Sequence, residues 1–214
     1  KFLSLSISWV TPCLTAISDS FWILSIAADK FSSLEKALQE KPDMVFVTNP
    51  SQFHYSSTLK SLMAKSFVFI EKPLSTDLKS AEEIYNLEKK LNKKYCMVGF
   101  QYRFHPALIK LKELLESNLI GRLINGHIAN GEYLPSWHPY EDYRKSYASQ
   151  KELGGGAILT QIHDFDYSIY LFGMPKSLYT IGGKLSSLDL NVEDCVNVST
   201  SFFYQNSILP INIT

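Results

Sequence analysis

The chain has 214 residues, of which 45% are hydrophobic and 20% are charged, a composition typical of a globular protein with one large or two small domains. Lysine plus arginine and aspartate plus glutamate both number 21, which argues against a nucleic acid or an anionic membrane as partner. Cys13, Cys96 and Cys195 are odd in number and far apart, as expected of free thiols in a reducing compartment, so we predict a cytoplasmic protein.

The first 28 residues are rich in apolar side chains and serine, and they show no recognisable first strand, glycine turn and helix of a dinucleotide-binding fold. Polar residues interrupt every apolar run, and none approaches the roughly 18 residues that a membrane-spanning helix needs. A secretory signal would also conflict with the cysteine pattern. We therefore expect neither export nor a membrane anchor.

From residue 31 the pattern alternates between helices and short apolar strands. Ser32, Ser33 and Glu35 predict a helix start. Residues 44–47 and 67–70 then predict two strands buried on both faces, with a helix carrying His54 between them. Strand, helix and strand within about thirty residues predict a right-handed βαβ unit and a parallel sheet.

The second of these strands leads directly into Glu71, Lys72 and Pro73. Proline cannot donate a hydrogen bond to a neighbouring strand, so Pro73 ends the strand. Lys72 is thereby placed at the carboxyl end of a sheet strand, where open α/β sheets bind their ligands. An isolated lysine in this place is more often a surface charge, and the sequence around it leaves both interpretations open.

Further along, Ser75, Thr76 and Asp77 cap a helix that we predict through Leu91. A strand over 95–100 and an amphipathic helix over 107–117 follow, and the latter part of the chain predicts alternating strands over 123–130, 178–185, 196–204 and 208–213, with Gln205 and Asn206 as a hairpin turn. We predict an α/β protein: a partial Rossmann-type parallel sheet in residues 1–104, then an α+β domain with a mainly antiparallel open sheet in residues 105–214.

Three glycines at 154–156 precede what we predict to be one long helix. Thr160, His163 and Tyr167 are spaced i, i+3 and i+7, so they share one face of a continuous helix. Asp166, three residues after His163, could orient its imidazole. A lone histidine on a helix is more often structural, but the glycine-rich entry and the nearby acid favour a function here.

Four segments together resemble the Gfo/Idh/MocA family of nicotinamide-dependent sugar oxidoreductases. They are VFVTNPSQFH (45–54), VFIEKPLS (68–75), VGFQYRFHPALIKLKELLESNLIGRL (98–123) and GGGAILTQIHDFDYSIYLFG (154–173). The segment YLPSWHPYEDYR (133–144) is further similar to members that act on amino sugars or nucleotide sugars.

The resemblance implies a Rossmann domain that binds NAD or NADP, followed by a domain whose open sheet covers the nicotinamide and often mediates a dimer or tetramer. It implies hydride transfer between the nicotinamide and a carbinol or carbonyl carbon of a sugar or nucleotide sugar, with Lys72 and His163 as catalytic residues and no metal. The cofactor-binding residues that it implies are Thr48, Asn49, Pro50, His54, Glu71, Lys72, Gln101 and Arg103. The substrate-binding residues are Lys72, Arg103, Trp137, Thr160, His163 and Tyr167.

This chemistry needs a base within hydrogen-bond reach of the hydroxyl that loses hydride. Imidazole titrates near neutral pH, and an ammonium beside it can stabilise the developing alkoxide. A buried lysine can also lose its proton readily enough to be the base itself. The sequence leaves open whether Lys72 or His163 has that role.

Two features depart from the family pattern. Thr160 lies where many members carry an acid one turn before the histidine, and all ten glycines lie at or after Gly99, so the GxGxxG turn is missing. We therefore expect an internal fragment of the oxidoreductase, with a foreign or scrambled leader and a C-terminally truncated second domain. The alternative is a non-catalytic remnant, or a sugar-binding or subunit-like module without a working cofactor site.

Overall fold

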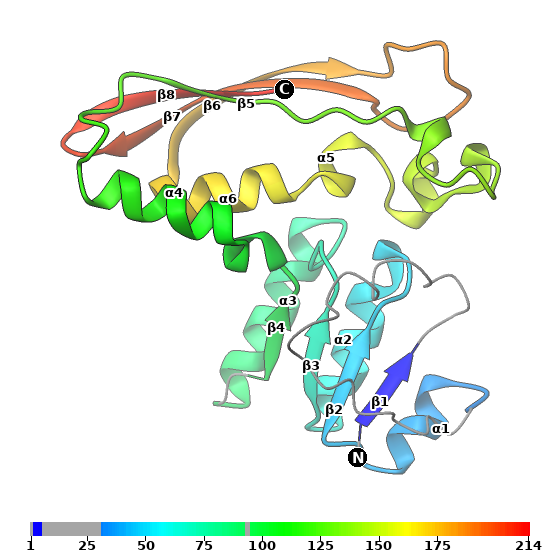
Figure 1. Cartoon of the computed structure of the whole chain (residues 1–214). Coiled ribbons are helices and arrows are strands. Elements are labelled where there is room, and N and C mark those ends of the chain that lie inside the picture. Colours follow the sequence, from blue (N-terminus) through cyan, green and yellow to red (C-terminus); the bar gives the residue numbers. More distant parts are fainter. Residues whose placement is uncertain (1, 6–30, 93–94) are drawn as a thin grey trace. The chain divides into compact units, whose positions relative to one another are not determined.

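The computed structural model describes residues 2–5, 31–92 and 95–214 (Figure 1). The chain divides into two compact units, of which the first extends to Gly99 and the second runs from Phe100 to Thr214. The predicted boundary lay a few residues later, after Phe104. The 3-10 helix Gln101–Phe104 (η3) therefore belongs to the second unit.

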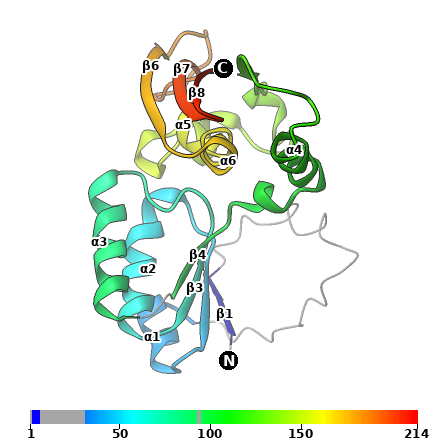
Figure 2. The ribbon, with the colours of Figure 1, turned by 90° about the vertical axis from the view of Figure 1, so that its left-hand side faces the viewer.

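The first unit contains a sheet of four parallel strands in the order β1-β2-β3-β4. Its elements are β1 (Phe2–Leu5), α1 (Leu34–Gln39), β2 (Met44–Val47), η2 (Ser51–Phe53), α2 (His54–Met63), β3 (Phe67–Ile70), α3 (Leu78–Lys90) and β4 (Cys96–Val98). Two successive βαβ units lead from β2 to β4, as the apolar runs predict. The three α-helices lie on the same side of the sheet (Figure 2).

β1 corrects one expectation, because we predicted no recognisable first strand in residues 1–28. Phe2–Leu5 pairs in parallel with β2, from Phe2 opposite Met44 to Leu5 opposite Val47. A four-residue strand that no glycine turn follows is hard to identify from sequence, since strands are recognised largely by their boundaries. The remaining residues of that stretch, 6–28, lie outside the described part of the chain.

The core of the first unit lies between the sheet and its helices. It contains Val45, Val47, Leu62, Val68, Ile70 and Ile84. The prediction that β3 is buried on both faces is not met among the described residues, because Phe67 is 40% exposed and Phe69 is half-buried against Phe46. Alternate side chains of a strand point to opposite faces, and the described helices cover only one of them.

The second unit packs helices against a mixed sheet in the order β5-β8-β7-β6. Its helices and strands are α4 (Pro106–Glu116), β5 (Gly126–Ile128), α5 (Ala157–Thr160), α6 (His163–Phe172), β6 (Pro175–Gly183), β7 (Cys195–Tyr204) and β8 (Ser207–Ile213). Three strands are antiparallel and β5 runs parallel to β8, which agrees with the predicted mainly antiparallel sheet. Gln205 and Asn206 form the predicted hairpin turn, both with positive φ.

A segment of 3-10 helices connects β5 to α5. It comprises η4 (Leu134–Ser136), η5 (Tyr143–Lys145), η6 (Tyr147–Ser149) and η7 (Lys151–Leu153). The core of this unit is formed by one face of the sheet, where Phe202, Leu209 and Ile211 are buried, and by Phe165 and Phe172 of α6. The opposite face of the sheet is its outer face.

The prediction of one long helix after the three glycines is wrong. Gln161 and Ile162 form a turn between α5 and α6, and Gln161 has a ψ of 30°, outside the helical range. The amide of Asp164 accordingly bonds to the carbonyl of Gln161, three residues back. Neither glycine nor proline marks this break, which is why the sequence pattern does not show it.

Candidate functional site

In the first unit, the loops after β2 and β3 carry most of the predicted cofactor-binding residues. The two strands are parallel neighbours with Val47 opposite Ile70, so the loops leave the same edge of the sheet. Five half-buried side chains lie on them: Thr48, Asn49, Pro50, Glu71 and Lys72. Lys72 is followed by a cis peptide bond to Pro73. The prediction that Lys72 lies at the carboxyl end of a sheet strand is confirmed in the fold.

His54 joins the two loops. It is the first residue of α2 and is 1% exposed. Its Nδ1 lies 2.6 Å from the carbonyl oxygen of Pro73, and its Nε2 lies 2.8 Å from the carbonyl oxygen of Asn49. Both ring nitrogens are therefore engaged by the backbone.

Asn49 offers an acceptor at this edge of the sheet. Its Nδ2 donates to Oγ of Ser57 at 3.0 Å, while its Oδ1 is buried and accepts no hydrogen bond among the described residues. A buried amide oxygen without a donor is costly, and a ligand that supplies an N–H or O–H group would remove that cost. The residues here thus fit a nicotinamide nucleotide, which carries amide and hydroxyl donors.

In the second unit, several aromatic and amide groups surround His163. This residue begins α6 and is 5% exposed. The ring of Tyr102 stacks on the imidazole at a centroid distance of 4.3 Å, and Phe100 meets it edge-on at 6.2 Å. Nε2 of His163 lies 3.3 Å from the side-chain nitrogen of Gln101. Two of the residues implied by the resemblance, Gln101 and His163, are therefore neighbours.

Arg103 and Asp166 form an ion pair beside this cluster. The guanidinium donates from Nε at 2.9 Å and from Nη2 at 2.5 Å, so it occupies both carboxylate oxygens. The hydrogen bond to Asp166 raises the pKa of Arg103. The carboxylate of Asp166 is thus held by Arg103 in a bidentate geometry, and the suggestion that it orients the imidazole of His163 stays a prediction.

The remaining predicted substrate residues lie in three different elements. Thr160 is the buried last residue of α5, Tyr167 is half-buried on α6, and Trp137 is half-buried after η4 with its ring 6.0 Å from that of His138. Burial is the main cause that raises the pKa of Tyr167. Because α5 and α6 are separate helices, the spacing of one continuous helix does not place Thr160 on the face of the other two.

Sequence reasoning missed Tyr102 as a site residue. It lies between Gln101 and Arg103 in a segment that the sequence did single out, and its stacking on His163 restricts the plane of the imidazole. Aromatic residues in short connecting segments are common, so nothing in the sequence distinguished this one. The position within the QYRF segment was the available signal.

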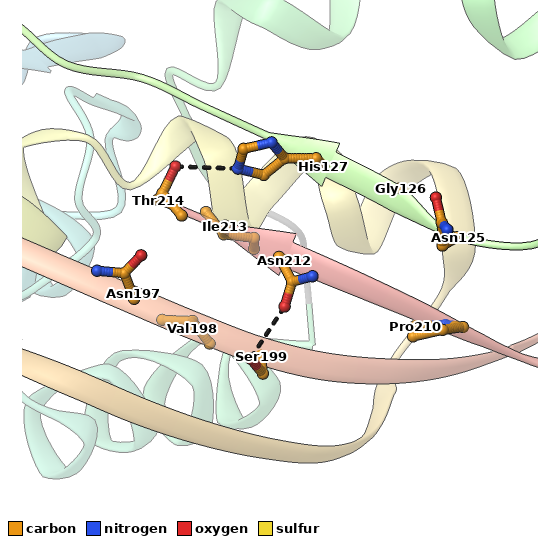
Figure 3. A pocket seen from close by; sticks show the side chains of 10 residues that line it. All are labelled: Asn125, Gly126, His127, Asn197, Val198, Ser199, Pro210, Asn212, Ile213 and Thr214. Carbon is orange, nitrogen blue, oxygen red and sulfur yellow. Dashed lines mark hydrogen bonds between the residues drawn. The ribbon is translucent and has the colours of Figure 1, made fainter.

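The outer face of the second unit's sheet contains a separate pocket of about 620 Å³. Figure 3 shows His127 of β5, Asn212 of β8 and Ser199 of β7 side by side along it. His127 bonds to Thr214 at 3.2 Å, and Ser199 donates to Asn212 at 2.9 Å. None of the predicted site residues lines this pocket.

In residues 2–5, 31–92 and 95–214, no three histidine, cysteine or acidic side chains are grouped so that they could hold a metal ion. No helix in the same part of the chain has the length and apolar character needed to cross a membrane.

Curated proteins with sequences similar to this chain include dehydrogenases of inositol. The chain is 26% identical over 129 residues to an inositol 2-dehydrogenase/D-chiro-inositol 3-dehydrogenase of Lactiplantibacillus plantarum, covering 60% of this chain and 33% of that protein. It is 37% identical over 98 residues to an inositol 2-dehydrogenase of Corynebacterium glutamicum, covering 45% of this chain and 29% of that protein. The chain thus spans about a third of the length of these curated relatives.

Solved structures show the same fold. An oxidoreductase from Thermotoga maritima superposes with a TM-score of 0.72 at 24% identity, covering 87% of this chain and 57% of that one. The WlbA dehydrogenase from Chromobacterium violaceum, solved in complex with NADH and UDP-GlcNAcA, superposes with a TM-score of 0.71 at 23% identity. The match covers 87% of this chain and 53% of that one.

Family models match both units. Residues 20–100 match the model described as oxidoreductase family, NAD-binding Rossmann fold, and residues 108–206 match the model of the GFO/IDH/MocA C-terminal domain. The two matches follow the division of the structure into its two units. The chain therefore belongs to the Gfo/Idh/MocA family of oxidoreductases.

Proposed function

We propose that the protein to which this chain belongs transfers hydride between a nicotinamide cofactor and a sugar or nucleotide-sugar carbon. One observation carries the proposal. In the unit that matches an NAD-binding Rossmann fold, two loops leave the same sheet edge, and they present Lys72 together with the buried acceptor of Asn49. Dehydrogenases of inositol and glucoside among the relatives support a polyhydroxylated substrate, and WlbA supports a nucleotide sugar as the alternative.

The chain's residues would hold the cofactor and move the proton. Asn49 Oδ1 would accept a donor of the nucleotide, and Thr48, Pro50 and Glu71 would line the same loops. The bound nicotinamide supplies or accepts the hydride. His163 or Lys72 would take the hydroxyl proton, and the other would stabilise the charge on the substrate oxygen.

The second unit would orient the substrate. Tyr102 and Gln101 hold the imidazole of His163 from two sides. Arg103 uses Nε and Nη2 for Asp166, which leaves Nη1 for an acceptor on cofactor or substrate. We propose Trp137, Thr160 and Tyr167 as further substrate contacts, on the basis of the family resemblance alone.

The first experiment is binding of NADH and NADPH to the purified 214-residue chain, by fluorescence or calorimetry. Micromolar binding would support the cofactor site and show which nucleotide it prefers. A folded chain that binds neither would favour a second function, a sugar-binding module without a cofactor site. The motive for that alternative is the absence of any glycine before Gly99.

Replacement of Lys72 tests the catalytic assignment in the active protein. We expect Lys72→Met and His163→Asn each to lower kcat by about 10²–10⁴-fold, because each removes a group that handles the proton. Lys79→Met, which changes an exposed lysine of α3, is the matched control. Unchanged kcat and KM in Lys72→Met would refute the role of that lysine.

The proposal also covers the cellular compartment and the oligomeric state. We propose that the protein is cytoplasmic, because Cys96 and Cys195 are both free thiols, as a reducing compartment requires. We also propose a homo-oligomer, dimer or tetramer, formed through the outer face of the second unit's sheet, where Tyr179, Ile181 and Phe203 are exposed.

A further inference from the structure

The two hydrogen bonds of His54 have an unusual chemical requirement. Both partners are backbone carbonyl oxygens, at 2.6 Å from Nδ1 and 2.8 Å from Nε2, and a carbonyl oxygen only accepts. A neutral imidazole carries a single N–H group, whereas a doubly protonated ring donates from both nitrogens. In a neutral ring, one nitrogen lone pair would face a carbonyl oxygen in a site that is 1% exposed.

The two carbonyls belong to the loops that form the candidate cofactor site. Asn49 follows β2, and Pro73 follows β3 directly after Lys72. A second hydrogen bond joins the same loops, from Oγ1 of Thr76 to Oε1 of Gln52 at 3.2 Å. The segment that follows Lys72 is thus connected to the β2–α2 loop through side chains at Pro73 and at Thr76.

We propose that His54 is a positioning residue whose doubly protonated ring bridges the carbonyls of Asn49 and Pro73 and so fixes the loop that presents Lys72. It acts through these backbone groups, because its ring is buried and both nitrogens are occupied.

Other titratable groups lie on the bridged elements. Glu71 and Lys72 precede Pro73, Asp77 caps α3, and Tyr55 on α2 is hydrogen-bonded to Glu83. The loop after β2, from Thr48 to Phe53, carries none. Substitutions at His54 leave all of these groups in place, so a difference between variants reports on the imidazole.

Three variants separate the two halves of the bridge. Asparagine places its amide nitrogen near the position of Nδ1, so His54→Asn keeps a donor for Pro73, and His54→Gln places a donor near Nε2 for Asn49. His54→Leu removes both donors. Ser66→Ala is the matched control, because the buried Ser66 hydroxyl donates to the carbonyl of Pro42 at the opposite end of the same strands.

Two spectroscopic measurements on the 214-residue chain test the bridge directly. Nitrogen NMR should show both ring nitrogens of His54 protonated at neutral pH; a single protonated nitrogen would overturn the proposal. Amide exchange gives the second test, because the amide of Glu71 bonds to Val47 at the bridged end and that of Phe67 bonds to Asp43 at the other end.

In His54→Leu, exchange at Glu71 should accelerate about tenfold relative to Phe67, which is the effect expected for loss of a charge-assisted hydrogen bond. His54→Asn should show a smaller effect, and Ser66→Ala should instead affect Phe67. Equal acceleration at both ends in His54→Leu would indicate general destabilisation and overturn the positioning role. If His54→Leu does not fold, amide exchange in His54→Asn and Ser66→Ala decides. Faster exchange at Glu71 than at Phe67 in His54→Asn supports the positioning role, and equal acceleration at both ends overturns it.

The consequence for the cofactor rests on the proposed function. NADH affinity of the chain should fall about tenfold in His54→Leu. Equal NADH affinity in all variants would overturn the positioning role. A chain that binds no NADH would favour the module without a cofactor site and would leave the bridge untouched, since the NMR and exchange results decide the bridge independently.

Discussion

Arg103 combines an ion pair with contacts to two aromatic rings in the second unit. Its guanidinium binds both oxygens of Asp166, and it lies 5.6 Å and 5.5 Å from the ring centroids of Phe100 and Tyr170. The carboxylate side chain is 5% exposed and the arginine side chain 39% exposed. A buried carboxylate depends on its cation, because an unpaired charge out of water is strongly unfavourable.

Arg103→Leu should therefore lower the free energy of unfolding by about 2–3 kcal/mol, since it leaves the carboxylate of Asp166 unpaired. Arg144→Leu is the control: it removes a similar bidentate pair with Asp142 that is largely exposed, and such pairs contribute about 1 kcal/mol or less. Urea unfolding of the two variants measures the difference. Equal losses would show that the buried pair contributes no more than a surface pair.

The partner of Asp166 could not be predicted from the sequence. Its spacing of three residues from His163 favours an interaction within one helix turn, but the observed partner lies 63 residues earlier in the chain. The same limit applies to Tyr102 and to both partners of His54. Motifs single out Lys72, His163 and Arg103 as candidate residues, whereas the pairs that such residues form depend on the tertiary fold.

At the scale of elements, the turn of three glycines fixes where α5 begins. A Cβ atom on Gly155 would lie 2.4 Å from the carbonyl oxygen of Tyr147 and 2.6 Å from that of Ala148. Gly156 has a φ of +109° and faces the carboxylate of Glu193, which accepts from the amide of Ile158 at 3.1 Å. The glycines thus allow the 3-10 segment and the loop before β7 to contact the helix start.

Gly155→Ala should destabilise the second unit by about 2–3 kcal/mol, because the added methyl group meets backbone atoms that cannot move independently. Gly131→Ala provides the comparison, since nothing lies within 4 Å of the added atom, and a change there should stay within about 0.5 kcal/mol. Thermal unfolding of both variants tests this. A Gly155→Ala chain as stable as the Gly131→Ala chain would contradict the steric account.

Elements whose ends are marked by proline, turn residues or helix caps were predictable from the sequence. β2 and β3 are short apolar runs bounded by proline or turn residues, Asp77 caps α3 through the amide of Ser80, and Gln205 and Asn206 turn the chain between β7 and β8. The break before α6 and the strand β1 carry no such marks. Their formation depends on packing and on the free edge of β2, which a local pattern does not contain.

At the scale of the whole molecule, the outer face of the second unit's sheet is the surface that we propose for contact with another copy of the chain. Phe203 and Ile208 are directly opposite on β7 and β8 and are 55% and 59% exposed. Tyr179 and Ile181 are similarly exposed on β6. Exposed apolar side chains gathered on one sheet face are typical of an interaction surface.

Phe203→Lys should shift the chain from an oligomer to a monomer in light scattering, because a charge buried in the contact between two copies would lack a partner. Leu178→Lys is the matched control. Leu178 is 66% exposed on the same sheet, but its register with the buried Thr200 places it on the opposite face. If both variants dissociate, the interface is not confined to the outer face; if the unsubstituted chain is monomeric at every concentration, the proposed oligomer is refuted. Dissociation by Phe203→Lys alone, with the free energy of unfolding changed by about 0.5 kcal/mol or less, would assign this face as the contact between subunits.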